Sequence, residues 1–234
     1  VIPQIDIKTE EKQRPVISKA DYQRFWALIQ DETDRKYQPW KEFVFTILCQ
    51  SSTILSELMR LERKDIHLDG ETPYISLYDT ELKTKDRQRI VPLPLRTERL
   101  QELLELMNEG QDSALPPSVV KMTGKKTAWV TSESNISRQL NDYIKACDSK
   151  TRGYTTYCTR HSFKLYLQLS GANPMDILYL AGWAGDNDQS QMLKHYGRQG
   201  IGSPEMMKRL EVVVWTAMHF LNARDEKVVQ LYKS

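Results

Sequence analysis

Four separated segments of the sequence carry side chains that together could bind one anion. They offer the phenol of Tyr196, the guanidinium of Arg160, the ammonium of Lys83 or Lys85, and the indole N–H of Trp183. A guanidinium holds two oxygens of one anion through its planar fork, and an indole N–H donates a further hydrogen bond. The set of groups therefore indicates an anion site, provided that the fold brings the four segments together.

The order and spacing of these segments match a known pattern. The segments are Leu-Ser-Glu-Leu-Met-Arg-Leu at 55–61, Lys-Thr-Lys at 83–85 before Val-Pro-Leu-Pro, Thr-Arg-His-Ser-Phe at 159–163, and Leu-Ala-Gly-Trp at 180–183 followed by Lys-His-Tyr-Gly-Arg at 194–198. No single piece is specific, but the ordered set resembles the catalytic domain of the tyrosine recombinase (phage integrase) family. The resemblance covers about residues 15–221, which is nearly the whole chain.

The resemblance implies a role for each matching residue. Tyr196 matches the nucleophile, whose oxygen attacks a DNA phosphodiester and stays joined to the 3′ phosphate while a 5′ hydroxyl leaves. Arg160 matches the second of the family's two arginines and would hold the non-bridging phosphate oxygens. Lys83 matches the hairpin lysine that gives a proton to the departing oxygen, with Lys85 as the alternative. Trp183 stands where the family has His or Trp, and its indole would donate a hydrogen bond and pack.

Two positions depart from the family pattern. Tyr157 lies three residues before the matching arginine, hence on the same helical face, where the family usually carries His. A tyrosine can still donate a hydrogen bond to a phosphate, but it is a poor base at neutral pH, so His161 and His195 are the nearby alternatives for proton removal. Ile54 stands where the family's first arginine would be, although Glu57 beside it is kept.

The departure at residue 54 is the larger of the two, because an apolar side chain cannot hold a phosphate. Losing a contact made mainly in the transition state costs on the order of 3 kcal/mol, which is about a hundredfold in rate. Arg60 and Arg63 are the neighbouring cations that could compensate. Arg60 lies six positions after Ile54 and is therefore not on the same helical face.

Hydrophobic periodicity and end signals predict the elements that must position these residues. Ser18 with Asp21 forms a capping box, and Asn173 before Pro174 caps another helix. The predicted helices are one after Ser18 and others at about 40–50, 54–61, 96–108, 135–146, 156–170, 174–181, a short one ending near 196, and 204–221. Alternation at 74–78 and 90–93 predicts a β-hairpin or small sheet, and Pro116-Pro117 indicates a loop. The expected fold is mainly α with a small antiparallel β-sheet (α+β).

A larger group of basic side chains is expected to contact the DNA backbone. Its members are Lys64, Lys83, Lys85, Arg87, Arg89, Lys125, Lys126, Arg138 and Lys145. The segment Gly124-Lys-Lys-Thr127 superficially resembles a phosphate-binding loop, but Val119 takes the place of the first glycine, so a P-loop is rejected. The sequence has no spacing of His, Cys, Asp or Glu that indicates a metal, and the expected chemistry needs no cofactor.

Composition sets the class of protein. The chain has 234 residues, of which 40% are hydrophobic and 27% charged, with a formal net charge of +2. These values exclude disorder and predict a soluble protein without a membrane span. Three unpaired cysteines indicate a reducing compartment. We expect residues 1–14 to be a linker or arm and 15–234 to be the catalytic domain, with an N-terminal core-binding domain absent from this chain.

Three hypotheses of function follow from the sequence. The first is a site-specific recombinase that cuts and rejoins double-stranded DNA through a 3′-phosphotyrosine, as a tetramer on DNA and with accessory DNA-bending proteins as further partners. The second is a recombinase-derived DNA-binding protein whose catalysis is impaired by Ile54 and Tyr157. The third is a helical interaction domain unrelated to DNA. The first two place the protein with DNA, in the cytoplasm or, in a eukaryote, the nucleus.

Overall fold

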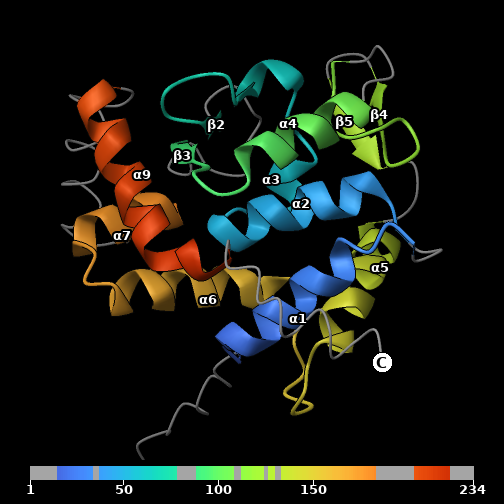
Figure 1. Cartoon of the computed structure of the whole chain (residues 1–234). Coiled ribbons are helices and arrows are strands. Elements are labelled where there is room, and N and C mark those ends of the chain that lie inside the picture. Colours follow the sequence, from blue (N-terminus) through green and yellow to red (C-terminus); the bar gives the residue numbers. More distant parts are fainter. Residues whose placement is uncertain are drawn as a thin grey trace, which may run out of the picture.

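The computed structural model describes residues 15–33, 37–77, 88–107, 112–123, 126–129, 133–182 and 203–221 (Figure 1). The helices are α1 (Lys19–Ile29), α2 (Pro39–Gln50), α3 (Leu55–Leu58), η1 (Arg63–Asp65), α4 (Thr97–Leu106), α5 (Glu133–Ala146), α6 (Tyr157–Leu169), α7 (Pro174–Ala181), α9 (Pro204–Met218) and η3 (His219–Leu221). The strands are β1 (Ile66–His67), β2 (Tyr74–Ser76), β3 (Ile90–Pro92), β4 (Val120–Thr123) and β5 (Lys126–Trp129). The fold is mainly helical with a small antiparallel sheet, as the sequence predicted.

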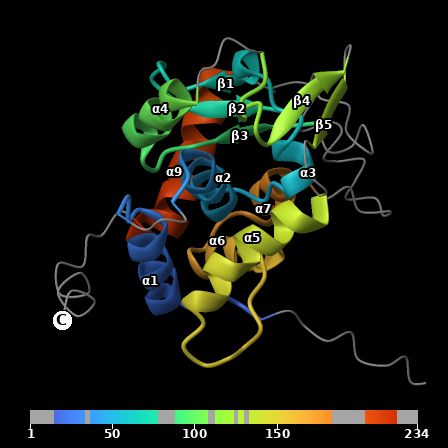
Figure 2. The same ribbon diagram turned by 90° about the vertical axis from the view of Figure 1, so that its right-hand side faces the viewer.

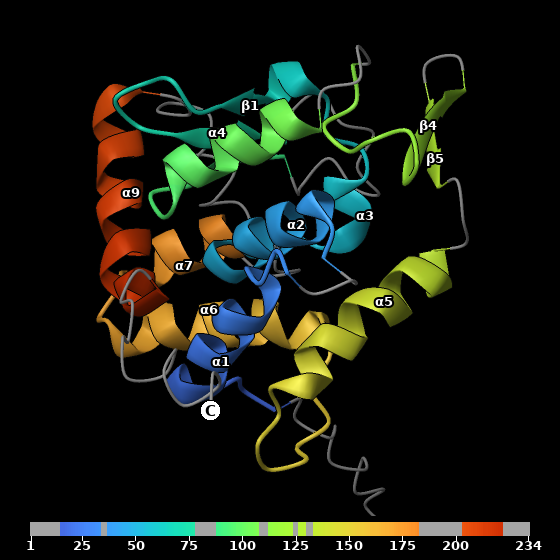
Figure 3. The same cartoon turned by 45° about the vertical axis from the view of Figure 1, so that its right-hand side comes forward.

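Helix α2 passes through the centre of the molecule. All of its residues from Trp40 to Gln50 are buried, so it contacts protein on every side. Figures 1 and 3 show α4 on one side of α2 and α6 with α1 on the other, and α2 packs directly against α4 and α6. A helix that is buried all round acts as the core around which the other elements are placed.

Helices α6, α7 and α9 form one packed group on the far side of this core. Helix α6 contacts both α7 and α9, and α9 also packs on β3, as the turned view shows (Figure 2). The apolar sequence of α9 divides into two sides: Met206, Leu210 and Val214 are buried, whereas Val212 and Trp215 are exposed. The predicted helix over 204–221 is confirmed, its last turn being the 3₁₀ helix η3.

The small sheet has the strand order β1-β2-β3 and is antiparallel throughout. Its register pairs Ile75 with both Ile66 and Val91, and Ile75 and Val91 are fully buried. The alternation at 74–78 and 90–93 therefore correctly predicted two of the strands. Because side chains alternate between faces along a strand, Arg89 shares the inward parity of Val91 and Leu93.

The structure differs from the sequence-based prediction in two places. Strands β4 and β5 form an antiparallel hairpin that pairs Val120 with Trp129, where only a loop was predicted between two helices. Four-residue strands in a lysine-rich segment give too short an alternation to be recognised. The predicted helix over 54–61 is also shorter: the amides of Arg60 and Leu61 bond three residues back, so the chain tightens into a turn after α3.

Both predicted helix caps are present. Ser18 accepts a hydrogen bond from the amide of Asp21 at the start of α1, and Asn173 accepts one from the amide of Met175 at the start of α7. The three cysteines are free and buried, and burial raises the pKa of Cys147 to about 12. In the described part of the chain, no helix combines the length and apolar character that a membrane span needs.

The carboxylate of Asp21 ties the segment before α6 to α1. Ser149 donates to Oδ1 at 2.7 Å, and Tyr154 donates to Oδ2 at 2.9 Å. Ser18 donates to Oδ2 at 2.7 Å, and Arg24 forms an ion pair at 2.9 Å. Burial opposes ionisation of Asp21, but the hydrogen bonds from Ser18, Ser149 and Tyr154 outweigh it and lower the pKa of the carboxyl below its usual value.

We expect Asp21→Asn to destabilise the protein by about 1–3 kcal/mol at pH 7, because the buried donors lose an ionised acceptor. A depressed pKa contributes stability above the unfolded value of 3.8, and this contribution is lost as the pH falls through the folded value. The difference between wild type and variant in urea unfolding should therefore shrink as the pH drops below about 4. Exposed Asp69→Asn is the control, and an equal loss of stability in both variants would contradict the assignment.

Candidate functional site

Arg160 lies in the first turn of α6 and joins three segments that are distant in the sequence. Its side chain is only 3% exposed. Nη1 donates to the carbonyl oxygen of Ser52, and Nη2 donates to that of Ala181 at 2.7 Å. The Ser52 hydroxyl also donates to the Ala181 oxygen, at 3.2 Å. The guanidinium thus links the segment before α3 to the last residue of α7.

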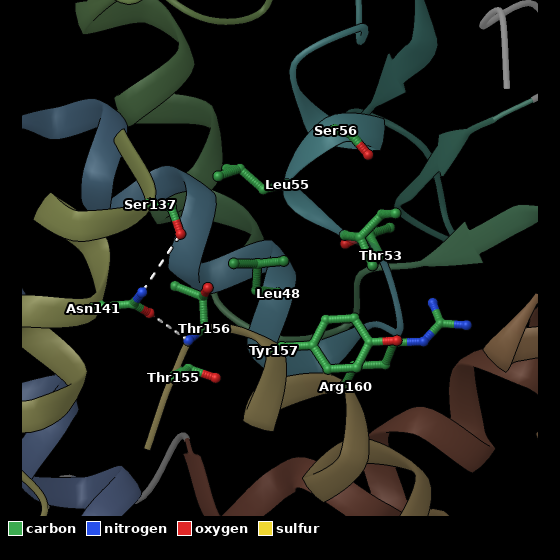
Figure 4. A pocket seen from close by; sticks show the side chains of 11 residues that line it. Leu48, Thr53, Leu55, Ser56, Ser137, Asn141, Thr155, Thr156, Tyr157 and Arg160 are labelled. Atoms are coloured by element: carbon green, nitrogen blue, oxygen red, sulfur yellow. Dashed lines mark hydrogen bonds between the residues drawn. The ribbon is translucent and has the colours of Figure 1, made fainter. Parts of the chain in front are cut away.

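A pocket of about 370 Å³ lies beside Arg160 (Figure 4). Helix α5 forms one wall, the segment from Thr53 into α3 forms the opposite wall, and the start of α6 lies between them. Eight of the eleven lining residues have a polar side chain, and the lining comprises Leu48, Thr53, Ile54, Leu55, Ser56, Ser137, Asn141, Thr155, Thr156, Tyr157 and Arg160. Among the described lining residues there is one cation and no carboxylate, so the pocket suits an anion bound by hydroxyl groups and a guanidinium.

Asn141 fixes the wall that α5 contributes. Its Oδ1 accepts the amide N–H of Thr156 at 2.8 Å, and its Nδ2 donates to the Ser137 hydroxyl at 3.4 Å (Figure 4). Because Thr156 immediately precedes α6, this contact sets the distance between α5 and the first turn that carries Arg160. The arrangement holds α5 to the start of α6 without using the guanidinium.

Ile54 lines this pocket in an extended backbone conformation at the start of α3. Its amide N–H donates to Oε2 of Glu57 at 3.0 Å. The apolar side chain therefore occupies the pocket position at which the resemblance placed an arginine. Arg63, one of the cations weighed as a substitute, donates instead to the carbonyl oxygen of Leu104, and neither it nor Arg60 lines the pocket.

Tyr157 lines the pocket one helical turn before Arg160 and is 40% exposed. Its ring lies 5.3 Å from the ring of His161, at an interplanar angle of 53°. The expectation that residues 157 and 160 share a face of one helix is met by α6, and both border the pocket (Figure 4). His161 packs on Tyr157 rather than lining the pocket itself.

Arg89 lies inside the protein and not on its surface. The side chain is 1% exposed and forms an ion pair with Glu57, at 3.3 Å between Nη2 and Oε2. The same carboxylate oxygen accepts the amide of Ile54. Sequence reasoning placed Arg89 among the DNA-backbone contacts and missed this pair, although the shared parity with Val91 was a signal that its side chain points inward.

The remaining predicted site residues divide into two groups. Arg138 is exposed on α5, where it donates to Asn135 at 2.7 Å, and Lys64 is exposed and paired with Glu62 at 2.9 Å. Lys145 is exposed near the end of α5, and Lys126 lies on β5. The positions outside the described residues are Tyr196, Trp183, Lys83, Lys85, Arg87, Lys125 and His195, together with the predicted short helix ending near 196 and the expected arm at 1–14.

The architecture is similar to that of several solved structures of recombinases and integrases. The chain matches the Tn1549 transposon integrase in complex with circular intermediate DNA at a TM-score of 0.52 and 16% identity, covering 86% of this chain and 68% of that one. It matches the integrase of mycobacterium phage Brujita at a TM-score of 0.58 and 11% identity, covering 92% of this chain and 64% of the integrase. For the XerH recombinase bound to its palindromic difH substrate after cleavage, the TM-score is 0.52 and the identity 14%. The match covers 94% of this chain and 53% of XerH.

The chain has the fold of the tyrosine recombinase catalytic domains. It spans about half to two thirds of the length of these three recombinase structures, with shares from 53% to 68%. No protein-family model and no curated protein matches the sequence. At these identities the likeness to recombinases establishes the fold, and the roles of the site residues rest on their own geometry.

The geometry predicts that Arg160 also supports the recombinase fold. Arg160→Ala should lower the free energy of unfolding by about 2–3 kcal/mol, because it removes two charge-assisted hydrogen bonds and leaves the buried Ser52 carbonyl without this donor. Arg160→Lys should lose less, since an ammonium can still reach one of the carbonyls. Urea unfolding measures both, with exposed Arg138→Ala as the control at less than about 0.5 kcal/mol. A fully stable Arg160→Ala variant would refute the bridging role.

Proposed function

We propose that this protein is a site-specific DNA recombinase that cleaves and rejoins double-stranded DNA through a covalent 3′-phosphotyrosine. The observation that carries the proposal is the pocket in which Arg160 and Tyr157 meet a wall of hydroxyl groups, on a fold shared with the recombinases. Two of the similar structures are complexes with DNA, which supports a DNA partner for this chain. As the catalytic domain, it would occupy residues 15–234.

In the proposed reaction, His161 or His195 takes the proton of the Tyr196 phenol, the phenol oxygen attacks a backbone phosphorus, and the bond to the 5′ oxygen breaks. Arg160 stabilises the charge on the non-bridging oxygens, and Lys83 or Lys85 gives a proton to the departing 5′ oxygen. Trp183 donates a hydrogen bond to the phosphate, and so does Tyr157. Because the phosphotyrosine conserves the energy of the broken bond, attack by a 5′ hydroxyl reverses the step.

The contacts of Arg160 support the assignment of the phosphate to this pocket. Its guanidinium is held by carbonyls on two sides, so little side-chain freedom remains to be lost when a phosphate binds. The hydroxyl groups of the lining can donate to the oxygens of the neighbouring phosphates, a contact that positions the duplex without reading its sequence. Lys85, Arg87, Lys125, Lys126 and Arg138 are the basic residues proposed to extend this interaction along DNA, whereas Arg89 is buried and is not among them.

The proposal includes partners beyond the duplex. Work on a full recombination site would use four copies of the chain, with accessory DNA-bending proteins as further partners. Such a protein would act where DNA is found, in the cytoplasm or, in a eukaryote, the nucleus.

A duplex that carries a nick close to the cleavage site, on its 3′ side, tests the proposal. The short fragment that carries the new 5′ hydroxyl diffuses away, so the strand cannot be rejoined and the covalent intermediate is trapped. We expect a protein–DNA adduct that survives denaturation and maps to Tyr196. Tyr196→Phe should abolish the adduct while binding the duplex with unchanged affinity, since only the nucleophilic oxygen is removed. If wild-type protein binds DNA but forms no adduct, the proposal that it is an active recombinase is wrong.

A specific observation favours a second candidate function. Ile54 lines the pocket at the position of the missing arginine, so this chain could bind DNA as a recombinase-derived protein with impaired cleavage. That alternative predicts duplex binding whose affinity falls steeply with salt, without an adduct. An affinity insensitive to salt would instead favour a helical interaction domain unrelated to DNA.

Ile54→Arg separates an impaired site from a competent one. The new guanidinium should accelerate adduct formation by up to about a hundredfold, because it adds a charge-assisted contact made in the transition state. The rate constant at saturating protein measures this effect. Ile54→Gln, which adds length and polarity without charge, is the matched control. A yield equal to or below that of wild type would count against the placement of residue 54 at the phosphate.

A further inference from the structure

The strongest feature outside the described pocket is the buried junction of Arg89, Glu57 and Gly182. Gly182 caps α7 in a left-handed conformation with φ of 61°. A methyl group at its α-carbon would lie 2.5 Å from Nη1 of Arg89 and 2.8 Å from Cζ. Because real β-carbons do not approach other atoms so closely, the guanidinium can lie against this turn only while residue 182 is glycine.

Three segments meet at this guanidinium. Arg89 immediately precedes β3, its ion-pair partner Glu57 lies on α3, and Gly182 caps the end of α7. A further bond fixes the same place, since the amide of Ile90 donates to the Tyr179 hydroxyl of α7 at 3.1 Å. Residues 89 and 90, where β3 begins, therefore meet the end of α7 at two points.

The junction adjoins the pocket on both of its sides. Glu57 uses one carboxylate oxygen for both Arg89 and the amide of Ile54, which is a lining residue. Ala181, the neighbour of Gly182, accepts the hydrogen bond from Arg160 at 2.7 Å. A shift of the Arg89 guanidinium would therefore move the two backbone segments to which the pocket's own cation is attached.

We propose that Arg89 is a positioning residue for DNA cleavage, which holds the α3 and α7 segments at the spacing that the phosphate site requires. This inference rests on the proposed recombinase function. Arg89 does not touch the DNA in this role: it acts through Glu57 on the position of Ile54, and through the Gly182 turn on the carbonyl that holds Arg160. Small displacements of such supports can cost about a hundredfold in rate.

Two glycine variants test the junction without removing a charge. Gly182→Ala should slow adduct formation about tenfold or more, because its methyl displaces the guanidinium. Gly171→Ala is the matched control: Gly171 ends α6 with φ of 76°, and a methyl group at its α-carbon would meet no atom within 4 Å, so the variant carries the same backbone strain without the displacement. Equal effects of the two variants would overturn the inference.

Variants at Arg89 test the same point through the charge. Arg89→Lys keeps a cation but cannot both pair with Glu57 and cover the turn, and we expect adduct formation to fall about tenfold or more. Arg89→Ala strands a buried carboxylate and endangers folding, so the double variant Arg89→Met with Glu57→Gln removes both charges together. The double variant should be more thermally stable than Arg89→Ala but should still form the adduct more slowly than wild type. If both its stability and its rate of adduct formation equal those of wild type, Arg89 has only a structural role.

Hydrogen exchange gives a readout that is independent of activity. The amide of Gly182 donates to the carbonyl oxygens of Leu178 and Tyr179 at the end of α7. Exchange of this amide should become at least about tenfold faster in Gly182→Ala and in the double variant, and stay unchanged in Gly171→Ala. If the exchange rate of this amide in the double variant equals that of wild type, the inference that Arg89 holds the end of α7 is wrong.

The outcomes also separate this inference from the proposed function. If wild-type protein forms no adduct, the recombinase proposal fails and the positioning role fails with it, whatever hydrogen exchange shows. If wild type forms the adduct and the Arg89 and Gly182 variants do so at the wild-type rate, only the positioning role is lost.

Discussion

The bridge from the Arg160 guanidinium to the carbonyl oxygens of Ser52 and Ala181 is the interaction on which the candidate site depends. A buried cation is costly unless its donors find acceptors, and here two backbone carbonyl oxygens accept from Nη1 and Nη2. The same contacts fix the segment before α3 and the end of α7. A group proposed to bind a phosphate is thus also a structural support, so loss of activity in its variants must be separated from loss of folding.

Two buried guanidinium groups, from segments that are distant in the sequence, converge on the same short turn. Arg160 bonds Ala181, and Arg89 lies against Gly182 while paired with Glu57. The C-terminal end of a helix carries partial negative charge, which makes this turn a favourable place for cations. The site is therefore built around the end of α7 as much as around the helix that carries Arg160.

The sequence predicted much of the fold, because long periodic helices and clear caps such as Ser18 and Asn173 are local signals. It missed the β4–β5 hairpin, whose strands of four residues are too short to show alternation. It predicted that residues 157 and 160 share a helix face, but not the pairing of Arg89 with Glu57 across 32 positions. Such pairings depend on tertiary packing, which no local pattern encodes.

The hydrogen bonds around Arg160 have a consequence for folding. They join positions separated by 108 and 129 residues in the chain, as the Arg160–Ser52 and Ser52–Ala181 contacts show. Contacts between such remote positions require closure of long loops and form late. During synthesis, a nascent chain that has not yet emerged as far as α7 lacks one of the two carbonyl anchors, so the pocket beside Arg160 can be completed only after α7 has left the ribosome.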